Sequence, residues 1–331
     1  MEEHGFVFFT GIWRIRKGRS LYEGTDNPER FANYGLDQVE RMKSKGLEVH
    51  YNATGKAYTH EEFKALSKDA DAIIVGVDKM DREMMEGCPN LKAVCKFGVG
   101  TDNIDLDYAK ERNIHVGRCV GSNSRSVAEH VLSMMFMEAK NLYTSVRDVK
   151  QHGWNKPTGR EIYGKKLGII GFGMIGKYLA EYAYGCGMEV YAYDAFAIAE
   201  ETARQYHAQI STLEDILTDC DYISLHVPLL ESTRNMISTE EFKKMKKDAC
   251  LLNAARGGIV NEEALYEALK KKEIRSACFD VYSSEPPRED DKLLTLDNFL
   301  LTPHTAARSM ESEQRTCAMS TDIILEQLIG N

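Results

Sequence analysis

The sequence has no CxxC cysteine pair, no excess of positive charge and no long hydrophobic run. Its eight cysteines are scattered singly along 331 residues, which excludes a zinc or disulfide framework and is typical of reduced thiols in the cytoplasm. Lysine and arginine total 42 against 51 acidic residues, so no basic face for nucleic acid is expected. The start, MEEHGFVFF, lacks the basic region of a signal peptide. The most apolar window, LGIIGFGMIG, is short and broken by glycine, so we expect no membrane span.

What is present is a balanced globular composition, with 43% hydrophobic and 28% charged residues. A chain of this length is expected to form two domains. Short β-rich runs alternate with amphipathic helical stretches, which predicts parallel sheets with crossover helices. The predicted strands are Phe6–Phe9, Leu47–Tyr51, Ala72–Val75, Leu91–Cys95 and His115–Val116, then Leu167–Ile170, Val190–Tyr193, Tyr222–His226, Cys250–Asn253, Ala277–Asp280 and Leu300–Thr302. The predicted helices include Leu36–Lys45, His60–Leu66, a long apolar helix at Ser124–Leu142 between the two sets, and a last helix from about Met310.

A glycine-rich turn, GFGMIG, follows the first strand of the second set and opens a helix. Gly171 allows a tight turn, Gly173 admits a pyrophosphate close to the backbone, and Gly176 permits close helix–strand packing. Asp194 ends the next strand, where its carboxylate would accept bonds from a ribose; no arginine follows it, which favours NAD over NADP. A plain turn with packing glycines is the alternative. The helix that begins here offers free N–H groups at its start to the phosphates. The predicted cofactor-binding residues of this turn are Gly171, Gly173, Met174, Ile175, Gly176 and Asp194.

Three later strands each end in a residue suited to chemistry. Arg256 follows the strand ending at Asn253, Glu285 lies in the loop after Asp280, and His304 follows Thr302. Ligands of such sheets bind outside the carboxyl ends of the strands, so these side chains are expected at one edge. A guanidinium fits a carboxylate, a histidine exchanges a proton near neutral pH, and a glutamate favours the imidazolium. With a hydride carrier, the set would interconvert a 2-hydroxy and a 2-keto acid. Each residue taken alone would be an ordinary solvated loop residue.

Over nearly its whole length the chain resembles the D-isomer-specific 2-hydroxyacid dehydrogenase family. The segments GIIGFGMIG, NAARGGIVNEEAL, FDVYSSEPP and TPHTAA match four family signatures in order and spacing. The resemblance implies that Arg256 binds the substrate, that His304 is the acid/base and that Glu285 pairs with it. The formate dehydrogenase branch carries glutamine at the position of Glu285 and is disfavoured. The resemblance also implies cofactor contacts by Pro228, Thr233, Ala254 and Asp280, the last two at the nicotinamide carboxamide.

The resemblance implies two doubly wound α/β domains with the active-site cleft between them. A flavodoxin-like substrate domain would comprise residues 1–123 and 307–331, and a Rossmann NAD-binding domain residues 124–306. The loop KFGVGTDNID would cradle the substrate carboxylate through the N–H groups of Val99 and Gly100; a helix-entry loop with turn glycines is the alternative. Family members pair as homodimers through the cofactor domains, which the Ser124–Leu142 helix would suit, although a core helix would look the same.

Within the family the chain is most like phosphoglycerate dehydrogenases, and we expect it to lack their regulatory domain. Lys96 lies where those enzymes place a phosphate-binding arginine, and the stretch GIWRIRKGR adds Arg14, Arg16, Lys17 and Arg19. These cations would bind a phosphate or a second carboxylate, or would form a solvated basic loop. The expected substrate is therefore 3-phosphoglycerate or a related sugar acid.

Three departures from the family pattern leave the substrate open. Arg118 replaces an asparagine before the GSN turn, Asn261 replaces an aspartate and is expected to affect only a helix cap, and Arg308 follows HTAA in place of the usual His-x-Gly. A glyoxylate or hydroxypyruvate reductase is the second enzyme hypothesis. An NAD-sensing protein related to the corepressor branch is a third, because that branch keeps the same arginine, glutamate and histidine.

Overall fold

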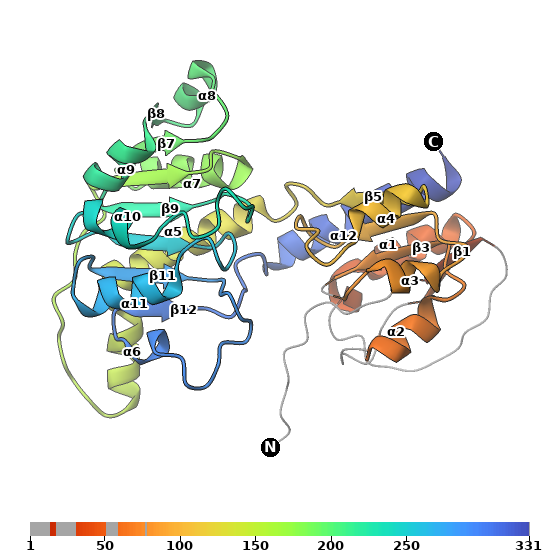
Figure 1. The fold of residues 1–331 in the computed structure, drawn as a ribbon, viewed down its shortest axis with the longest axis horizontal. Coiled ribbons are helices and arrows are strands. Elements are labelled where there is room, and N and C mark those ends of the chain that lie inside the picture. Colours follow the sequence, from red (N-terminus) through yellow and green to blue (C-terminus); the bar gives the residue numbers. More distant parts are fainter. Residues whose placement is uncertain (1–13, 18–30, 51–58, 77, 331) are drawn as a thin grey trace. The chain divides into compact units, whose positions relative to one another are not determined.

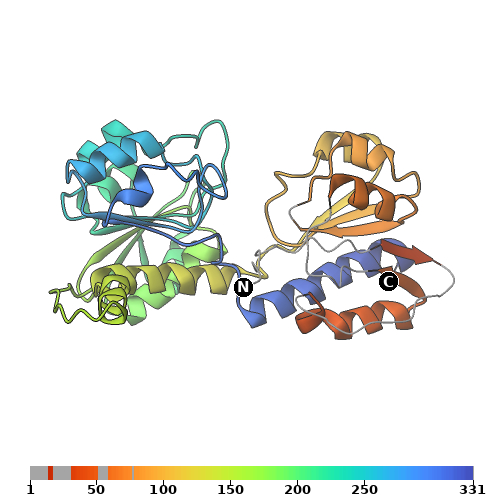
Figure 2. The ribbon, with the colours of Figure 1, turned by 90° about the horizontal axis from the view of Figure 1, so that it is seen from below.

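The computed structural model describes residues 14–17, 31–50, 59–76 and 78–330. The chain divides into two compact units: unit 1, residues 1–123 and 308–331, and unit 2, residues 124–307. Figures 1 and 2 show that each unit has its own sheet covered by helices. The α/β fold class is confirmed.

Unit 1 is built on a five-stranded sheet in the order β2-β1-β3-β4-β5. Its strands are β1 (Arg14–Lys17), β2 (Leu47–His50), β3 (Ala72–Val75), β4 (Ala93–Lys96) and β5 (His115–Arg118). Its helices are α1 (Phe31–Ser44), α2 (His60–Ser67), α3 (Arg82–Glu86), α4 (Leu106–Glu111) and α12 (Met310–Ile329). Along β3 alternate residues enter opposite cores: Ile73 joins side chains of α2, α3 and α4, and Ile74 joins those of α1 and α12.

The first strand of unit 1 departs from prediction. β3, β4 and β5 are parallel, but β1 runs antiparallel to both β2 and β3, so this sheet is not wholly parallel. Arg14–Lys17, expected as a basic loop, is strand β1; the Arg-Ile-Arg alternation has the period of a strand. The predicted strand Phe6–Phe9 and Arg19 lie outside the described residues.

Unit 2 is a seven-stranded parallel sheet in the order β12-β11-β10-β9-β6-β7-β8. Its strands are β6 (Lys166–Ile170), β7 (Glu189–Tyr193), β8 (Ala208–Ile210), β9 (Tyr222–Leu225), β10 (Cys250–Asn253), β11 (Ser276–Phe279) and β12 (Phe299–Leu301). Its helices are α5 (Ser124–Ala139), α6 (Leu142–Lys150), α7 (Met174–Gly185), α8 (Glu200–Gln205), α9 (Leu213–Asp219), α10 (Thr239–Lys244), α11 (Glu262–Lys270) and the 3₁₀ helix η1 (Leu293–Thr295).

The sheet of unit 2 is buried on both faces. Along β10, Leu251 packs with side chains of α9, α10 and α11, whereas Cys250 and Leu252 pack with those of α5 and α7. Near-continuous apolar strands such as CLLN reflect this double coverage. The strand order reverses between β6 and β9, the switch point outside which doubly wound sheets bind their ligands.

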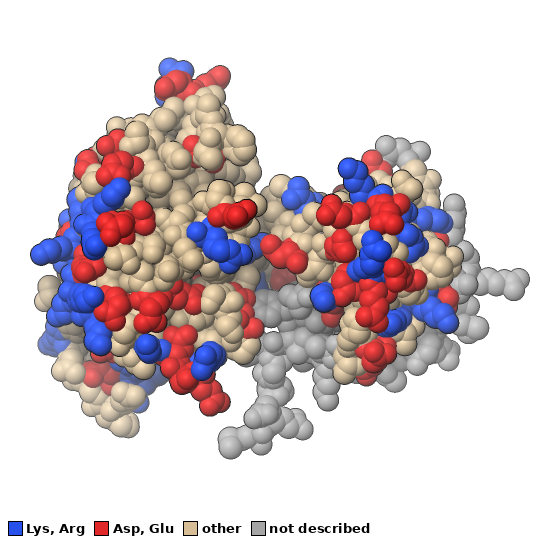
Figure 3. Space-filling model, viewed as in Figure 1, with Lys and Arg blue, Asp and Glu red and all other residues tan. Residues whose placement is uncertain are grey.

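Two elements of unit 2 were not anticipated. The helix predicted at Ser124–Leu142 ends at Ala139, because Asn141 adopts a left-handed conformation with φ 53°, and a separate helix, α6, begins at Leu142. The three-residue edge strand β8 was also missed. None of the helices in the described part of the chain is both long and apolar enough to cross a bilayer. On the face shown in Figure 3, basic and acidic side chains are intermixed over both units.

Candidate active site

The glycine-rich turn between β6 and α7 is shaped by close backbone contacts. Gly171 has φ 98°, and a Cβ there would lie 2.5 Å from the carbonyl oxygen of His226. At Gly176 a Cβ would lie 2.5 Å from the carbonyl oxygen of Gly171. Gly173, the N-cap of α7, has no heavy atom within 4 Å of a built Cβ, and no side chain caps the helix there. The turn is therefore closely packed at Gly171 and Gly176 and open at Gly173. This open side would let a phosphate approach the N–H groups of Met174 and Ile175.

Asp194 follows β7 and is hydrogen-bonded to the same turn. Its Oδ2 accepts a bond from the Phe172 N–H at 2.7 Å, and its Oδ1 accepts one from the Phe196 N–H at 3.0 Å. Each carboxylate oxygen has a second lone pair for a ribose hydroxyl. The glycine cradle and this acceptor pair together fit an adenine dinucleotide with an unsubstituted 2′-hydroxyl.

Arg256 lies in a turn held by a buried amide that the sequence did not single out. The Asn253 side chain donates to the Arg256 carbonyl at 2.9 Å and accepts from the Ala255 N–H at 3.0 Å. The Arg256 guanidinium donates to the Ala255 carbonyl at 2.7 Å. The next residue, Gly257, packs so closely that a Cβ would overlap the Tyr282 carbonyl, so the loops after β10 and β11 are in contact.

Glu285 and His304 form a close pair. Nδ1 of His304 lies 2.8 Å from Oε2 of Glu285, and Oε1 of Glu285 accepts a bond from the Tyr282 N–H at 2.9 Å. Burial acts to raise the pKa of Glu285, but the bonds from His304 and Tyr282 and the charges of His304 and Arg256 outweigh it, and the pKa is lowered. Glu285 therefore remains a carboxylate at neutral pH and is bonded to Nδ1 of His304. A histidine is the side chain best suited to exchange a proton near neutral pH.

Asp280 anchors the loop that carries His304. Its Oδ1 accepts from the Thr302 hydroxyl at 2.5 Å and the Thr305 N–H at 2.9 Å, and its Oδ2 accepts from the Ala306 N–H at 2.8 Å. His130 of α5 lies 3.5 Å from Oδ1 of Asp280 and 3.0 Å from the Thr302 hydroxyl. Sequence reasoning missed His130, because 150 positions separate it from Asp280 and 172 from Thr302, and only packing of α5 brings them together.

The remaining predicted cofactor residues follow β9 and β10. The Thr233 hydroxyl donates to the Pro228 carbonyl at 2.6 Å and accepts from the Leu230 N–H at 2.8 Å, which closes the loop after β9. Ala254 directly follows β10. All these residues extend from the carboxyl ends of the unit 2 strands, so the structure gathers every predicted cofactor residue along one edge.

Lys96, Val99 and Gly100 lie in unit 1, at and just beyond the end of β4. Within the described residues, the N–H groups of Val99 and Gly100 have no backbone hydrogen-bond partner, which suits an anion cradle. The Arg118 side chain, at the end of β5, is exposed. Arg308 lies 4.0 Å from Glu313 in unit 1, and Asn261 caps α11 through the Ala264 N–H, as expected for a cap residue.

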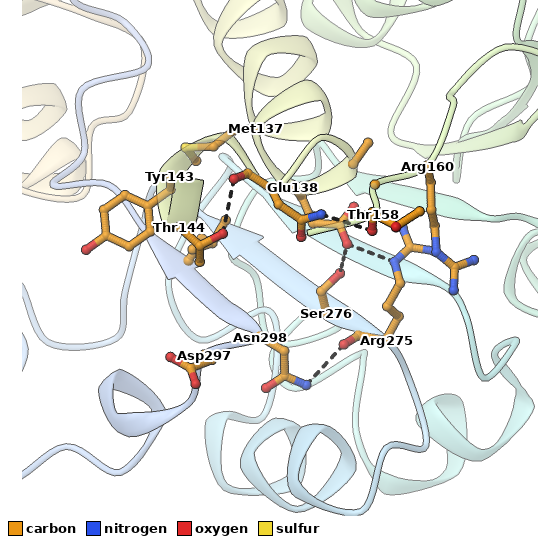
Figure 4. A pocket seen from close by; sticks show the side chains of 14 residues that line it. Met137, Glu138, Tyr143, Thr144, Thr158, Arg160, Arg275, Ser276, Asp297 and Asn298 are labelled. Atoms are coloured by element: carbon orange, nitrogen blue, oxygen red, sulfur yellow. Dashed lines mark hydrogen bonds and ion pairs between the residues drawn. The ribbon is translucent and has the colours of Figure 1, made fainter. Parts of the chain in front are cut away.

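A hollow of about 230 Å³ in unit 2 lies at the opposite, amino end of the sheet (Figure 4). Beside it Glu138 accepts bonds from Arg275 at 2.8 and 3.0 Å and from Ser276 at 2.8 Å. None of the predicted site residues lines this hollow, so we assign it no part in catalysis. Among the residues that the structure describes, no group of histidine, cysteine, aspartate and glutamate side chains could hold a metal ion.

One edge of the unit 2 sheet carries both the glycine-rich turn and the hydrogen-bonded pair Glu285–His304, in an α/β fold. Residues 132–306 match the family model described as the D-isomer specific 2-hydroxyacid dehydrogenase, NAD binding domain. The chain therefore belongs to the D-isomer-specific 2-hydroxyacid dehydrogenase family, and the predicted family is confirmed.

The alignment with this chain covers a different share of each relative. The D-3-phosphoglycerate dehydrogenase of Methanocaldococcus jannaschii is 38% identical over 84% of this chain and 53% of the relative. The hydroxypyruvate reductase of Thermotoga maritima is 35% identical over 87% of this chain and 93% of the relative. The structure of D-lactate dehydrogenase from Aquifex aeolicus with NAD and lactic acid has a TM-score of 0.71 and 32% identity, covering 81% of this chain and 88% of that one. The chain spans about half the length of the first two phosphoglycerate dehydrogenases that it matches.

Proposed function

We propose that this chain is an NAD-dependent oxidoreductase that interconverts a D-2-hydroxy acid and its 2-keto acid. The observation that carries the proposal is the 2.8 Å contact between Glu285 and His304, on the same sheet edge as the glycine-rich turn. We assign residues 124–306 as the dinucleotide-binding domain, and residues 1–123 and 307–331 as the substrate domain.

The cofactor is held by backbone and carboxylate groups of unit 2. N–H groups of Met174 and Ile175 at the start of α7 bind the pyrophosphate, and Asp194 accepts from the adenosine ribose. Ala254 and Asp280 contact the nicotinamide carboxamide, and Pro228 and Thr233 shape the loop beside it. When bound, the nicotinamide supplies or accepts the hydride at the substrate C2 atom.

Three side chains act on the substrate. Arg256 pairs its planar guanidinium with the substrate carboxylate and polarises the carbonyl. His304 donates a proton to the carbonyl oxygen in the reducing direction and takes it from the hydroxyl in the oxidising direction. Glu285 orients the ring through Nδ1 and stabilises the imidazolium, so that Nε2 is the atom that exchanges the proton.

We propose a substrate with three carbons or more, either 3-phosphoglycerate with phosphohydroxypyruvate or a related sugar acid. The N–H groups of Val99 and Gly100 bind its carboxylate, and Lys96 ends β4, directly before this loop. A glyoxylate or hydroxypyruvate reductase is the second candidate. It is favoured by the relative in Thermotoga maritima, which this chain covers to 93% of its length.

A panel assay tests the reaction class. NADH absorbance is followed with phosphohydroxypyruvate, hydroxypyruvate, glyoxylate, pyruvate and branched-chain keto acids, using the intact chain and His304→Ala. We expect turnover of at least one acid and a loss in kcat of about 100-fold or more in His304→Ala, with NADH binding retained. NADH binding without turnover of any acid would instead support the NAD-sensing alternative, and full activity in His304→Ala would refute the assignment of the acid/base.

We also propose that the protein is a cytoplasmic homodimer. Seven of the eight free cysteines are buried and none forms a disulfide, as is usual in a reducing compartment. The amphipathic helix α6 has no buried residue. Its apolar residues Leu142, Tyr143, Val146 and Val149 are 48–54% exposed and form one stripe, beyond the β12 edge of the unit 2 sheet in Figure 1. A second copy covering this stripe would remove it from water.

A further inference from the structure

Lys96, the cation expected to meet a substrate phosphate, is bonded inside unit 1. Its ammonium donates to the Asn103 side-chain oxygen at 2.7 Å and, through a short contact, to the Gly76 carbonyl. Gly76 follows β3, Lys96 ends β4, and Asn103 lies at the far end of residues 97–103, which we call the substrate loop. The ammonium thus joins the two loops that leave neighbouring parallel strands.

Asn103 fixes the end of the substrate loop from both its side chain and its backbone. Its amide group donates to the Gly76 carbonyl at 3.1 Å and the Asp78 carbonyl at 2.5 Å, and its own carbonyl accepts from the Met80 N–H at 2.7 Å. The start of the loop is fixed separately, since Phe97 N–H donates to the Val75 carbonyl at 2.8 Å. Between these ends lie Val99 and Gly100, whose N–H groups form the proposed carboxylate cradle.

The charge of Lys96 is also balanced by a neighbour. Oδ2 of Asp78 is buried and has no hydrogen-bond partner among the described residues. Burial raises the pKa of Asp78 to about 6, while its own backbone bond and the charge of Lys96 oppose the rise. At neutral pH the carboxylate is therefore ionised beside the ammonium. An approaching phosphate dianion would meet a pair with no net charge, whose ammonium already donates to two oxygen acceptors of the protein.

We propose that Lys96 and Asn103 are positioning residues that hold the substrate loop in its carboxylate-binding shape, and that Lys96 does not select phosphorylated substrates. The inference rests on the proposed function, because the cradle is a site for the carboxylate common to all 2-keto acids. Loss of the Lys96–Asn103 bond then weakens binding of phosphorylated and unphosphorylated acids by the same factor.

Kinetics of matched variants separate positioning from phosphate recognition. Lys96→Met, Asn103→Ala and the double variant are assayed with phosphohydroxypyruvate and hydroxypyruvate. We expect each single variant to raise KM for both acids by a similar factor, about 3- to 30-fold, with kcat within about twofold and the double variant no worse than either single one. Lys92→Met is the control, because Lys92 lies just before β4 and forms an ion pair with Asp71 at 2.9 Å.

A KM increase in Lys96→Met confined to the phosphorylated acid, with Asn103→Ala unaffected, would overturn the proposal. If Lys96→Met melts below the assay temperature, Lys96→Gln carries the same comparison, since it removes the charge but keeps a donor. Amide hydrogen exchange gives a readout independent of turnover. The N–H groups of Met80 and Ile104 donate to the Asn103 and Thr101 carbonyls of the loop at 2.7 and 3.0 Å. Both should exchange faster in the two single variants, and at the wild-type rate in Lys92→Met. Unchanged exchange in the variants would refute the positioning role even if no acid in the panel were turned over.

Discussion

His304 occupies a backbone conformation that few residues other than glycine adopt, with φ 53°. Such a conformation costs on the order of 1–3 kcal/mol and persists only where neighbouring groups hold it. Here Asp280 accepts hydrogen bonds from the N–H groups of Thr305 and Ala306, the two residues after His304. Glu285 is bonded to the imidazole ring of His304. Asp280 and Glu285, which both follow β11, thus hold this backbone conformation and fix the orientation of the imidazole.

Replacing Glu285 by glutamine should leave the ring oriented but remove the charge that favours the imidazolium. We expect kcat for keto-acid reduction to fall about 10- to 100-fold, with a larger loss at alkaline pH, where a protonated histidine is hardest to maintain. Stopped-flow NADH oxidation from pH 6 to 9 measures this, and Glu289→Gln, an exposed glutamate in the same loop, is the control. An unchanged pH profile in Glu285→Gln would show that the carboxylate has no electrostatic role.

At the scale of elements, the site was predictable to the extent that it depends on strand order. In a parallel sheet the carboxyl ends share one edge, so Arg256, Glu285 and His304 could be placed together from chain order alone. Contacts set by packing were not predictable: His130 reaches Asp280 from α5, and nothing in the local sequence of α5 marks it. The internal bonds of Lys96 were also missed, because a lysine after a strand gives no sign of which oxygens its long side chain will reach.

The start of α7 offers a prediction about a single methyl group. Because a Cβ at Gly173 meets no protein atom, Gly173→Ala should lower the free energy of unfolding by no more than about 1 kcal/mol, yet the methyl would occupy the approach of the pyrophosphate. We expect the Kd for NADH to rise about tenfold or more, a loss of about 1.4 kcal/mol in binding, as measured by fluorescence titration. Gly185→Ala, at the other end of α7 with equally open space, is the control. Equal NADH affinity in the two variants would show that the turn at Gly173 does not bind the cofactor.

At the scale of the whole molecule, the two units were foreseeable from two alternating sets of strands and helices, but the surfaces they expose were not. Helix α6 was missed because the apolar pattern of α5 continues to Leu142, and the break depends on the left-handed Asn141. Its exposed stripe could be recognised only once the structure showed no neighbour within the described chain covering it.

Charges on that stripe should separate the two copies of the proposed dimer. The double variant Val146→Asp and Val149→Asp would bury two unpaired carboxylates from each copy in the interface. We expect the dissociation constant of the dimer to rise about 100-fold or more, equivalent to about 2.7 kcal/mol, as read by sedimentation over a concentration series. Val120→Asp, which changes an exposed valine of unit 1, should leave the dimer intact. A wild-type chain that sediments as a monomer at all concentrations would rule out the dimer.

The return of α12 to unit 1 has a consequence for the order in which the protein can be made. One core of unit 1 joins Val39 and Met42 of α1 to Cys317 and Ile324 of α12, although all of unit 2 lies between them in the chain. On the ribosome, unit 2 therefore emerges complete and can fold while this core still lacks the side chains of α12. The apolar side chains of α1 that pack against α12 stay exposed to water until α12 has been synthesised. A chaperone that covers this apolar face during that interval would protect the nascent chain from aggregation.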